Sequence, residues 1–138
     1  MVEVQQKFTS DAESVREIRT LIGDRLHQLW NRAADETAIC QLQLAVSEAA
    51  TNIILHGYHS EPGRQIEMIL DIDDERADVL LRHSGCDFQP DLVPLPDFDA
   101  RAESGYGLYL IRKSVDELQY SHHQDGRCQI RLLKNRKS

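Results

Sequence analysis

The sequence has little of what marks secreted, membrane-spanning or nucleic-acid-binding proteins. Its three cysteines, Cys40, Cys86 and Cys128, are odd in number and show no paired spacing, so neither a zinc knuckle nor a disulfide framework is predicted, which fits a reducing cytoplasm. No run of about 18 apolar residues occurs, and the chain does not open on a basic region followed by an apolar segment. The net charge of −7 disfavours nucleic-acid binding, and the locally basic residues 134–137 are interpreted as a solvated tail. We therefore expect a cytoplasmic protein with neither membrane nor nucleic acid as a partner.

What is present is the composition of one ordinary globular domain. The chain has 138 residues, of which 41% are hydrophobic and 28% charged, which is enough to build a hydrophobic core without metal or disulfide cross-links. The sequence shows no internal repeat and no flexible linker. A single domain over residues 1–138 is therefore predicted.

Two long helices are predicted from apolar residues that recur at three- and four-residue steps. The first begins at a capping box formed by Ser10 and Glu13 and runs to about Trp30. Its apolar face belongs either to the core or to an oligomer seam. The second helix covers residues 37–56, with Gly57 available as its C-terminal cap.

Strands are predicted where apolar and polar residues alternate, and most are joined by short turns. Between residues 84 and 105 there is little periodicity, and so long a connection in a small domain is typical of a lid or a binding loop. A short helix follows Gly107 to about residue 114. The expected strands are 2–8, at an edge, and 65–72, 77–82, 118–122 and 128–133. This order favours an α+β fold, with the helices packed on one face of a mixed, mostly antiparallel sheet.

The first group of residues that can carry chemistry lies in the second helix. Glu48, Asn52 and His56 stand four residues apart, so they share one side of the helix. Beside the small residues Ala45 and Ala49, they can line the floor of a pocket. Taken alone, the spacing favours a polar face that only meets water, and both interpretations stay open.

The second group is Gly105, Tyr106, Gly107 and Leu108, directly before an apolar helix. Glycines allow close approach of the backbone, and free amides at a helix start bind anions such as phosphate. A simple turn before a helix also uses glycines, so the pattern alone does not distinguish a phosphate site from such a turn.

The third group runs from His83, Ser84 and Gly85 to Phe88. It ends a buried strand and opens the long proline-containing connection. Strand ends beside loops are where ligands are often bound. By itself this segment indicates no particular ligand.

Together and in this order, the three groups resemble the GHKL superfamily of ATPases and kinases, and most closely its anti-sigma-factor serine kinases. Residues 44–58 are similar to their N box, in which glutamate, asparagine and a histidine-alanine-tyrosine sequence recur at these spacings. Residues 104–111 are similar to their second glycine box. The resemblance extends from Thr9 to Lys134 and includes the order of elements. It implies a two-layer α+β domain of the GHKL type that binds ATP.

The resemblance also implies a role for each matching residue. Asn52 matches the asparagine whose side-chain oxygen holds a magnesium ion at the triphosphate, and Glu48 matches the base that accepts the proton of a substrate serine. Gly105 and Gly107 match glycines that let a lid close over the phosphates. The nucleotide site so implied comprises Asn52, His56, His83, Ser84, Gly85, Phe88, Gly105, Tyr106, Gly107 and Leu108.

One position departs from the family pattern. Two residues before the glycine of the first glycine box, the family has an aspartate that receives the adenine amino group, and this chain has His83 there. An ionised carboxylate only accepts hydrogen bonds, whereas neutral histidine has one acceptor nitrogen and one donor. Three interpretations stay open: adenine contact by His83, contact through Ser84 or a water, and a strand-end histidine that touches no ligand.

The function that the resemblance implies is that of a serine/threonine-protein kinase of the anti-sigma-factor type, using ATP and Mg²⁺. Its expected partners are a STAS-domain anti-sigma antagonist, which it phosphorylates, and an alternative sigma factor. A homodimer is expected, with the first helix and the neighbouring strand as its seam. The departure at His83 keeps a second hypothesis open, a degenerate GHKL module that sequesters a partner without phosphoryl transfer. A sensor histidine kinase is disfavoured because no phosphoacceptor helix pair is found.

Overall fold

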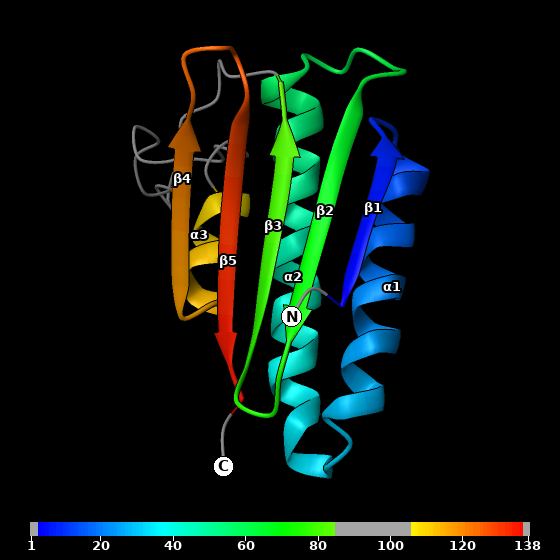
Figure 1. The fold of residues 1–138 in the computed structure, drawn as a ribbon, viewed down its shortest axis with the longest axis vertical. Coiled ribbons are helices and arrows are strands. Elements are labelled where there is room, and N and C mark those ends of the chain that lie inside the picture. Colours follow the sequence, from blue (N-terminus) through cyan, green and yellow to red (C-terminus); the bar gives the residue numbers. More distant parts are fainter. Residues whose placement is uncertain (1–2, 85–105, 137–138) are drawn as a thin grey trace.

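The computed structural model describes residues 3–84 and 106–136 (Figure 1). Its elements agree in type and order with those predicted, with a short 3-10 turn, Ala33–Asp35, and a π-helical turn, Ile53–Gly57, in addition. In chain order the helices and strands are β1 (Val4–Thr9), α1 (Ala12–Leu29), α2 (Glu36–Asn52), β2 (Gln65–Ile72), β3 (Arg76–His83), α3 (Tyr106–Ser114), β4 (Glu117–His122) and β5 (Cys128–Asn135).

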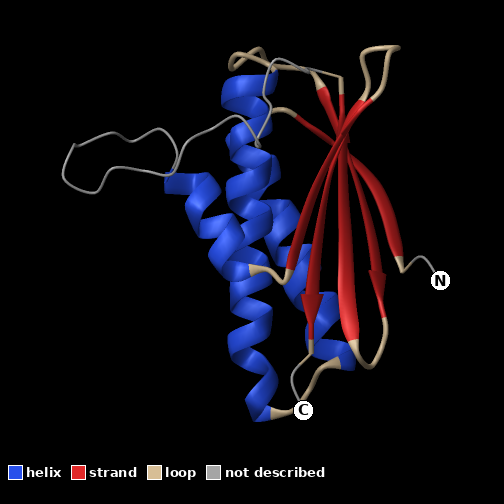
Figure 2. Cartoon of the chain, turned by 90° about the vertical axis from the view of Figure 1, so that its left-hand side faces the viewer, coloured by secondary structure: helices blue, strands red, loops and turns tan. Residues whose placement is uncertain are grey.

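The five strands form one sheet in the order β1-β2-β3-β5-β4, and every pairing is antiparallel. The β2–β3 hairpin turns at Asp73, whose side chain accepts the backbone N–H groups of Glu75 and Arg76. The β4–β5 hairpin turns at Gly126, where φ is 89°, a conformation natural to glycine. All three helices lie on one face of the sheet (Figure 2). The predicted α+β two-layer fold is confirmed, and the strands within the described ranges include no parallel pair.

The start of α1 differs from the prediction. Asp11, not Ser10, is the N-cap, and its carboxylate accepts the N–H of Ser14 at 2.9 Å. The hydroxyl of Ser10 instead accepts the backbone N–H of Arg64 at 3.0 Å. The predicted capping box of Ser10 and Glu13 is therefore wrong, because Ser10 is used to bind the segment before β2.

The second helix changes its winding near its end. After Asn52 comes the π-helical turn, in which the N–H of Tyr58 donates to the carbonyl of Ile53, five residues earlier, at 2.8 Å. The chain leaves the helix through residues 59 and 60, whose φ angles are 50° and 62°. The predicted cap at Gly57 is wrong, since the left-handed backbone comes two and three residues later.

The hydrophobic core fills the space between the helices and one face of the sheet. Ile18, Ile22 and Leu26 on the apolar face of α1 are fully buried in it, whereas Leu29 at the end of the helix is 39% exposed. Of the two interpretations of this face, core and oligomer seam, the structure supports the core for most of its length. The other face of the sheet carries no helix from residues 3–84 or 106–136 (Figure 2). The fully buried large side chains include Ile18, Ile22, Leu26, Trp30, Ile39, Leu42, Ile53, Ile66, Met68, Leu70 and Leu81.

The end of β5 is not the solvated basic tail that was predicted. Lys134 is 4% exposed, and its Nζ donates to Oε1 of Gln41 on α2 at 2.7 Å. Arg136 follows the strand and donates to both carboxylate oxygens of the buried Asp35, at 3.0 and 2.9 Å. The tail residues within the described part of the chain thus tie the last strand to the start of α2.

The continuous helical run Ala33–Gly57 is long and apolar enough, by length and composition, to cross a membrane. In its most apolar window, 44% is buried inside the molecule. A core helix of a soluble protein passes the same test, and α2 lies behind the middle of the sheet (Figure 1). The run on its own is therefore weak evidence for a span.

Of the three cysteines, the structure describes Cys40 and Cys128. Cys40 is exposed on α2 and free, whereas Cys128 is 1% exposed and disulfide-bonded. The expectation that the chain has no disulfide is therefore wrong at Cys128. The spacing of the cysteines gives no argument for a reducing compartment.

Candidate functional site

Glu48 and Asn52 lie one turn apart near the end of α2, and both are half-buried. Neither side chain makes a hydrogen bond or ion pair with another residue that the structure describes. The neighbouring hydroxyls are used by the helix itself, since Ser47 donates to the carbonyl of Gln43 and Thr51 to that of Ser47, each at 2.8 Å. A carboxylate and a carboxamide on one side of the helix are thus available to a ligand.

His56 does not continue this pair in the way its spacing predicts. It lies in the π-helical turn and is exposed, whereas Glu48 and Asn52 are half-buried in the regular helix. A π turn takes more residues per turn than an α-helix, so a step of four no longer keeps side chains in line. A part for His56 in the nucleotide site stays a prediction.

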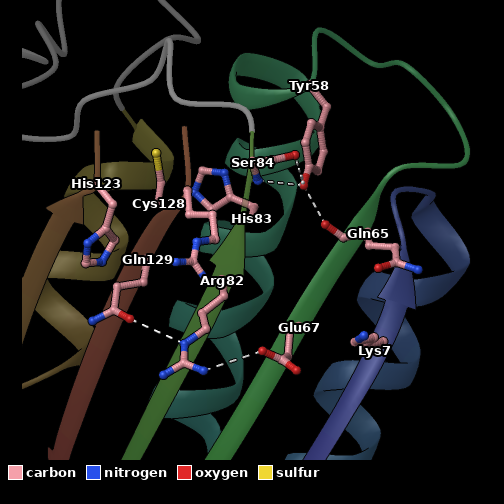
Figure 3. A pocket seen from close by; sticks show the side chains of 11 residues that line it. Lys7, Tyr58, Gln65, Glu67, Arg82, His83, Ser84, His123, Cys128 and Gln129 are labelled. Atoms are coloured by element: carbon pink, nitrogen blue, oxygen red, sulfur yellow. Dashed lines mark hydrogen bonds and ion pairs between the residues drawn. The ribbon is translucent and has the colours of Figure 1, made fainter. Parts of the chain in front are cut away.

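The end of β3 is a second fixed point. His83, the last residue of the strand, is 5% exposed, and its ring meets that of Tyr58 edge-on, with the centroids 6.0 Å apart. The backbone N–H of Ser84 donates to the Tyr58 hydroxyl at 3.0 Å (Figure 3). Arg64 donates to the Ser84 hydroxyl at 2.9 Å. His83 and Ser84, predicted to lie beside the base, are therefore held in place by the protein.

α3 packs along α2 and carries Gly107 in its first turn (Figure 2). The helix begins at Tyr106, two residues before the predicted start after Gly107. Backbone N–H groups of a first helical turn have no partner inside the helix, so they can receive an anion. Several predicted site residues lie outside the described residues. These are Gly85, Phe88 and Gly105, with the remainder of the predicted lid, and the side chains of Tyr106 and Leu108.

A pocket of about 570 Å³ opens near the same end of the sheet (Figure 3). Its lining includes Lys7, Glu67, Arg82 and Gln129, which are neighbours in register on β1, β2, β3 and β5. The lining contains neither Glu48 nor Asn52, so the pocket is separate from the carboxylate and carboxamide of α2. Sequence reasoning missed it because each residue belongs to a different strand and the order of strands was not predicted.

A magnesium ion carried by a triphosphate fits the donors on α2. No group of three or more His, Cys, Asp or Glu side chains that could hold a metal occurs among the residues that the structure describes. Magnesium bound with a nucleotide takes most of its oxygen ligands from phosphates and water. The carboxamide oxygen of Asn52, one turn from Glu48, is therefore a sufficient protein contribution.

Comparison with known proteins identifies the family of the chain. The histidine kinase-like ATPase domain family matches residues 8–134. The serine-protein kinase RsbW of Bacillus subtilis is 31% identical over 131 residues, which is 87% of this chain and 78% of that protein. The anti-sigma F factor of Oceanobacillus iheyensis is 27% identical over 121 residues, covering 85% of this chain and 81% of that protein.

Two solved structures share the fold. The RsbU and RsbW domains of Rv1364c from Mycobacterium tuberculosis match 98% of this chain and 33% of theirs, with a TM-score of 0.64 and 19% identity. The SiaB–SiaC complex from Pseudomonas aeruginosa matches 97% of this chain and 90% of that chain, also with a TM-score of 0.64, at 14% identity. The chain therefore belongs to the histidine kinase-like ATPase family, among its anti-sigma-factor serine kinases.

Proposed function

We propose that this protein is a serine/threonine-protein kinase that uses Mg-ATP to phosphorylate a STAS-domain anti-sigma antagonist in a partner-switching system. The relatives named as serine-protein kinases and anti-sigma factors support this proposal at the level of the family. The observation that carries it is the pair Glu48 and Asn52, half-buried side by side on α2 and bound to no other described side chain.

The proposed reaction assigns one task to each residue of the pair. Glu48 accepts the proton of the substrate hydroxyl as that oxygen forms a bond to the γ-phosphorus, while the bond from this phosphorus to the β-bridging oxygen breaks and ADP leaves. Asn52 holds, through its carboxamide oxygen, the magnesium ion, which when bound neutralises charge on the phosphate oxygens. The first-turn amides of α3, with Gly107, receive phosphate oxygens.

The base of the nucleotide is assigned to the end of β3. His83 and Ser84 lie there, and Gly85 and Phe88 follow in the sequence. Neutral His83 has one acceptor nitrogen, which can receive the adenine amino group. We also propose an alternative sigma factor as the second partner, a homodimer, and a cytoplasmic location. Ile18, Ile22 and Leu26 of α1 are buried in the core, so a dimer must use other residues.

Replacement of the proposed base tests the function directly. Glu48→Gln keeps the size of the side chain but cannot accept a proton, so phosphoryl transfer should fall by about 10²- to 10⁴-fold. Mg-ATP affinity, measured by calorimetry, should stay within about twofold, since Glu48 is not assigned to bind the nucleotide. The matched control is Glu17→Gln, at an exposed position of α1, which should change neither quantity. Full transfer by Glu48→Gln would remove Glu48 from the mechanism.

A second candidate function is a GHKL module that sequesters a sigma factor or another partner without phosphoryl transfer. The observation that favours it is His83 at the position where the family has an aspartate. The same calorimetry decides between the two. Mg-ATP binding of the unmodified chain at millimolar strength or weaker, together with tight binding of a partner, favours sequestration.

A further inference from the structure

The end of β3 is held by side chains to which the proposed reaction assigns no role. Tyr58 is 3% exposed, and its hydroxyl accepts the N–H of Ser84 at 3.0 Å and donates to the carbonyl of Gln65. One hydroxyl thus joins three segments: the residue after the π-helical turn, the start of β2 and the end of β3 (Figure 3). Gln65 lies seven residues from Tyr58 along the chain and Ser84 lies 26, so Tyr58 fixes the relative positions of segments that are not contiguous.

Arg64 covers this junction from the solvent side. The carbon of its guanidinium lies 4.7 Å from the centre of the Tyr58 ring, within the range of a cation–π contact. The same guanidinium donates to the hydroxyl of Ser84 at 2.9 Å and to the carboxylate of Glu61 at 3.1 Å. The backbone of Arg64 is held in turn by Ser10, which accepts its N–H at 3.0 Å. Arg64 is therefore anchored at both its backbone and its head group.

The junction contacts both described residues that the proposed function assigns to the base. The ring of His83 meets the edge of the Tyr58 ring at an interplanar angle of 85°, and Ser84 is bound through its backbone and its hydroxyl. Tyr58 also directly follows the helix that carries Asn52. The distance between the base-binding residues and α2, which carries Glu48 and Asn52, therefore depends on Tyr58.

We infer that Tyr58 and Arg64 are positioning residues for the nucleotide, which set the place of His83 and Ser84 relative to α2. This inference rests on the proposed function, because it takes Mg-ATP as the ligand. It assigns to neither side chain a contact with the phosphates. Their loss should therefore weaken binding of the nucleotide through displacement of the base-binding segment.

The test compares two buried aromatic residues that each donate one hydrogen bond to a backbone carbonyl. Tyr58→Phe removes the hydroxyl, and with it the hydrogen bonds to Ser84 and Gln65, and should weaken Mg-ATP binding about five- to tenfold, an effect of about 1 kcal/mol. It should also speed amide hydrogen exchange at Ser84 in the absence of nucleotide. The control, Trp30→Phe, removes the indole N–H that donates to the carbonyl of Asp73 at 2.8 Å, at the opposite end of the sheet. It should destabilise the fold but change the affinity by less than about twofold.

Arg64→Lys gives a second, surface-exposed variant that keeps the positive charge and loses the forked donor. The Mg-ATP affinity of Arg64→Lys should fall less than that of Tyr58→Phe, and its amide hydrogen exchange at Ser84 should become faster. If the unmodified chain binds Mg-ATP and Tyr58→Phe binds it equally well, the positioning role is overturned and the kinase proposal stands. If Trp30→Phe weakens binding as much as Tyr58→Phe, the effect is one of general stability and the role is again overturned. If the unmodified chain does not bind Mg-ATP, both proposals fail.

Discussion

At the residue scale, the buried carboxylate of Asp35 makes the stability of the protein depend on pH. Hydrogen bonds from Arg136, and then from Arg32, hold the pKa of Asp35 far below the ordinary value of 3.8. Because the pKa is lower in the folded state, this stabilisation is complete above pH 3.8 and is lost as the pH falls below it. Asp35→Asn should therefore lower the urea midpoint at neutral pH, and its difference from the unmodified chain should shrink towards about pH 3.

Asp24→Asn, on the exposed side of α1, is the control for this pH series and should leave the midpoint unchanged at both ends. A constant difference between Asp35→Asn and the unmodified chain over the whole range would contradict the assignment. The sequence could not predict this cluster, since Arg136 lies 101 residues from Asp35. The basic tail was interpreted as solvated because nothing local identifies its partner. By contrast, Glu48 and Asn52 could be selected from the sequence, because their spacing acts within a single helix.

At the element scale, Gly23 of α1 packs directly against the side chain of Gln43 on α2. A Cβ atom at this position would lie 2.2 Å from Nε2 of Gln43, which donates to the carbonyl of Arg19 at 3.1 Å. Gly23→Ala gains about 1 kcal/mol of helix propensity but displaces this exposed hydrogen bond, so its net effect should be within about 0.5 kcal/mol. In a Gln43→Ala background the conflict is absent, and Gly23→Ala should stabilise by about 1 kcal/mol. Urea unfolding of the four proteins measures the difference, and equal effects in both backgrounds would contradict the contact.

The elements that were predicted correctly depend on local patterns. The alternation of residues 65–72 and the turn at Asp73 identified the β2–β3 hairpin, because strand, turn and partner strand are contiguous. The predicted caps failed where tertiary contacts compete. Ser10 bonds to the segment before β2 instead of capping α1, and the π-helical turn carries the helix past Asn52 to Gly57. Neither competing contact leaves a signature in the local sequence.

At the scale of the whole molecule, one face of the sheet is left without helices and is stabilised by side-chain pairs across strands. Arg131 on β5 makes a two-pronged ion pair with Asp78 on β3, with 37% and 21% of the side chains exposed. A double-mutant cycle with Arg131→Gln and Asp78→Asn should give a coupling of about 0.5–1 kcal/mol that weakens with added salt. The longer pair of Arg82 with Glu67, at 3.5 Å, is the control and should couple less. Equal couplings for the two pairs would show that the two-pronged geometry of the Arg131–Asp78 pair does not strengthen its coupling.

The single tryptophan of the chain, Trp30, is fully buried at the end of the molecule away from His83 and Ser84, close to the β2–β3 turn. Its fluorescence therefore reports on the integrity of the core and is shielded from events at the far end of the sheet. The emission should stay constant while nucleotide is added and should shift to the red only when the chain unfolds. Trp30 is thus an intrinsic fluorescence probe of folding. The two processes can then be followed separately in the unlabelled protein.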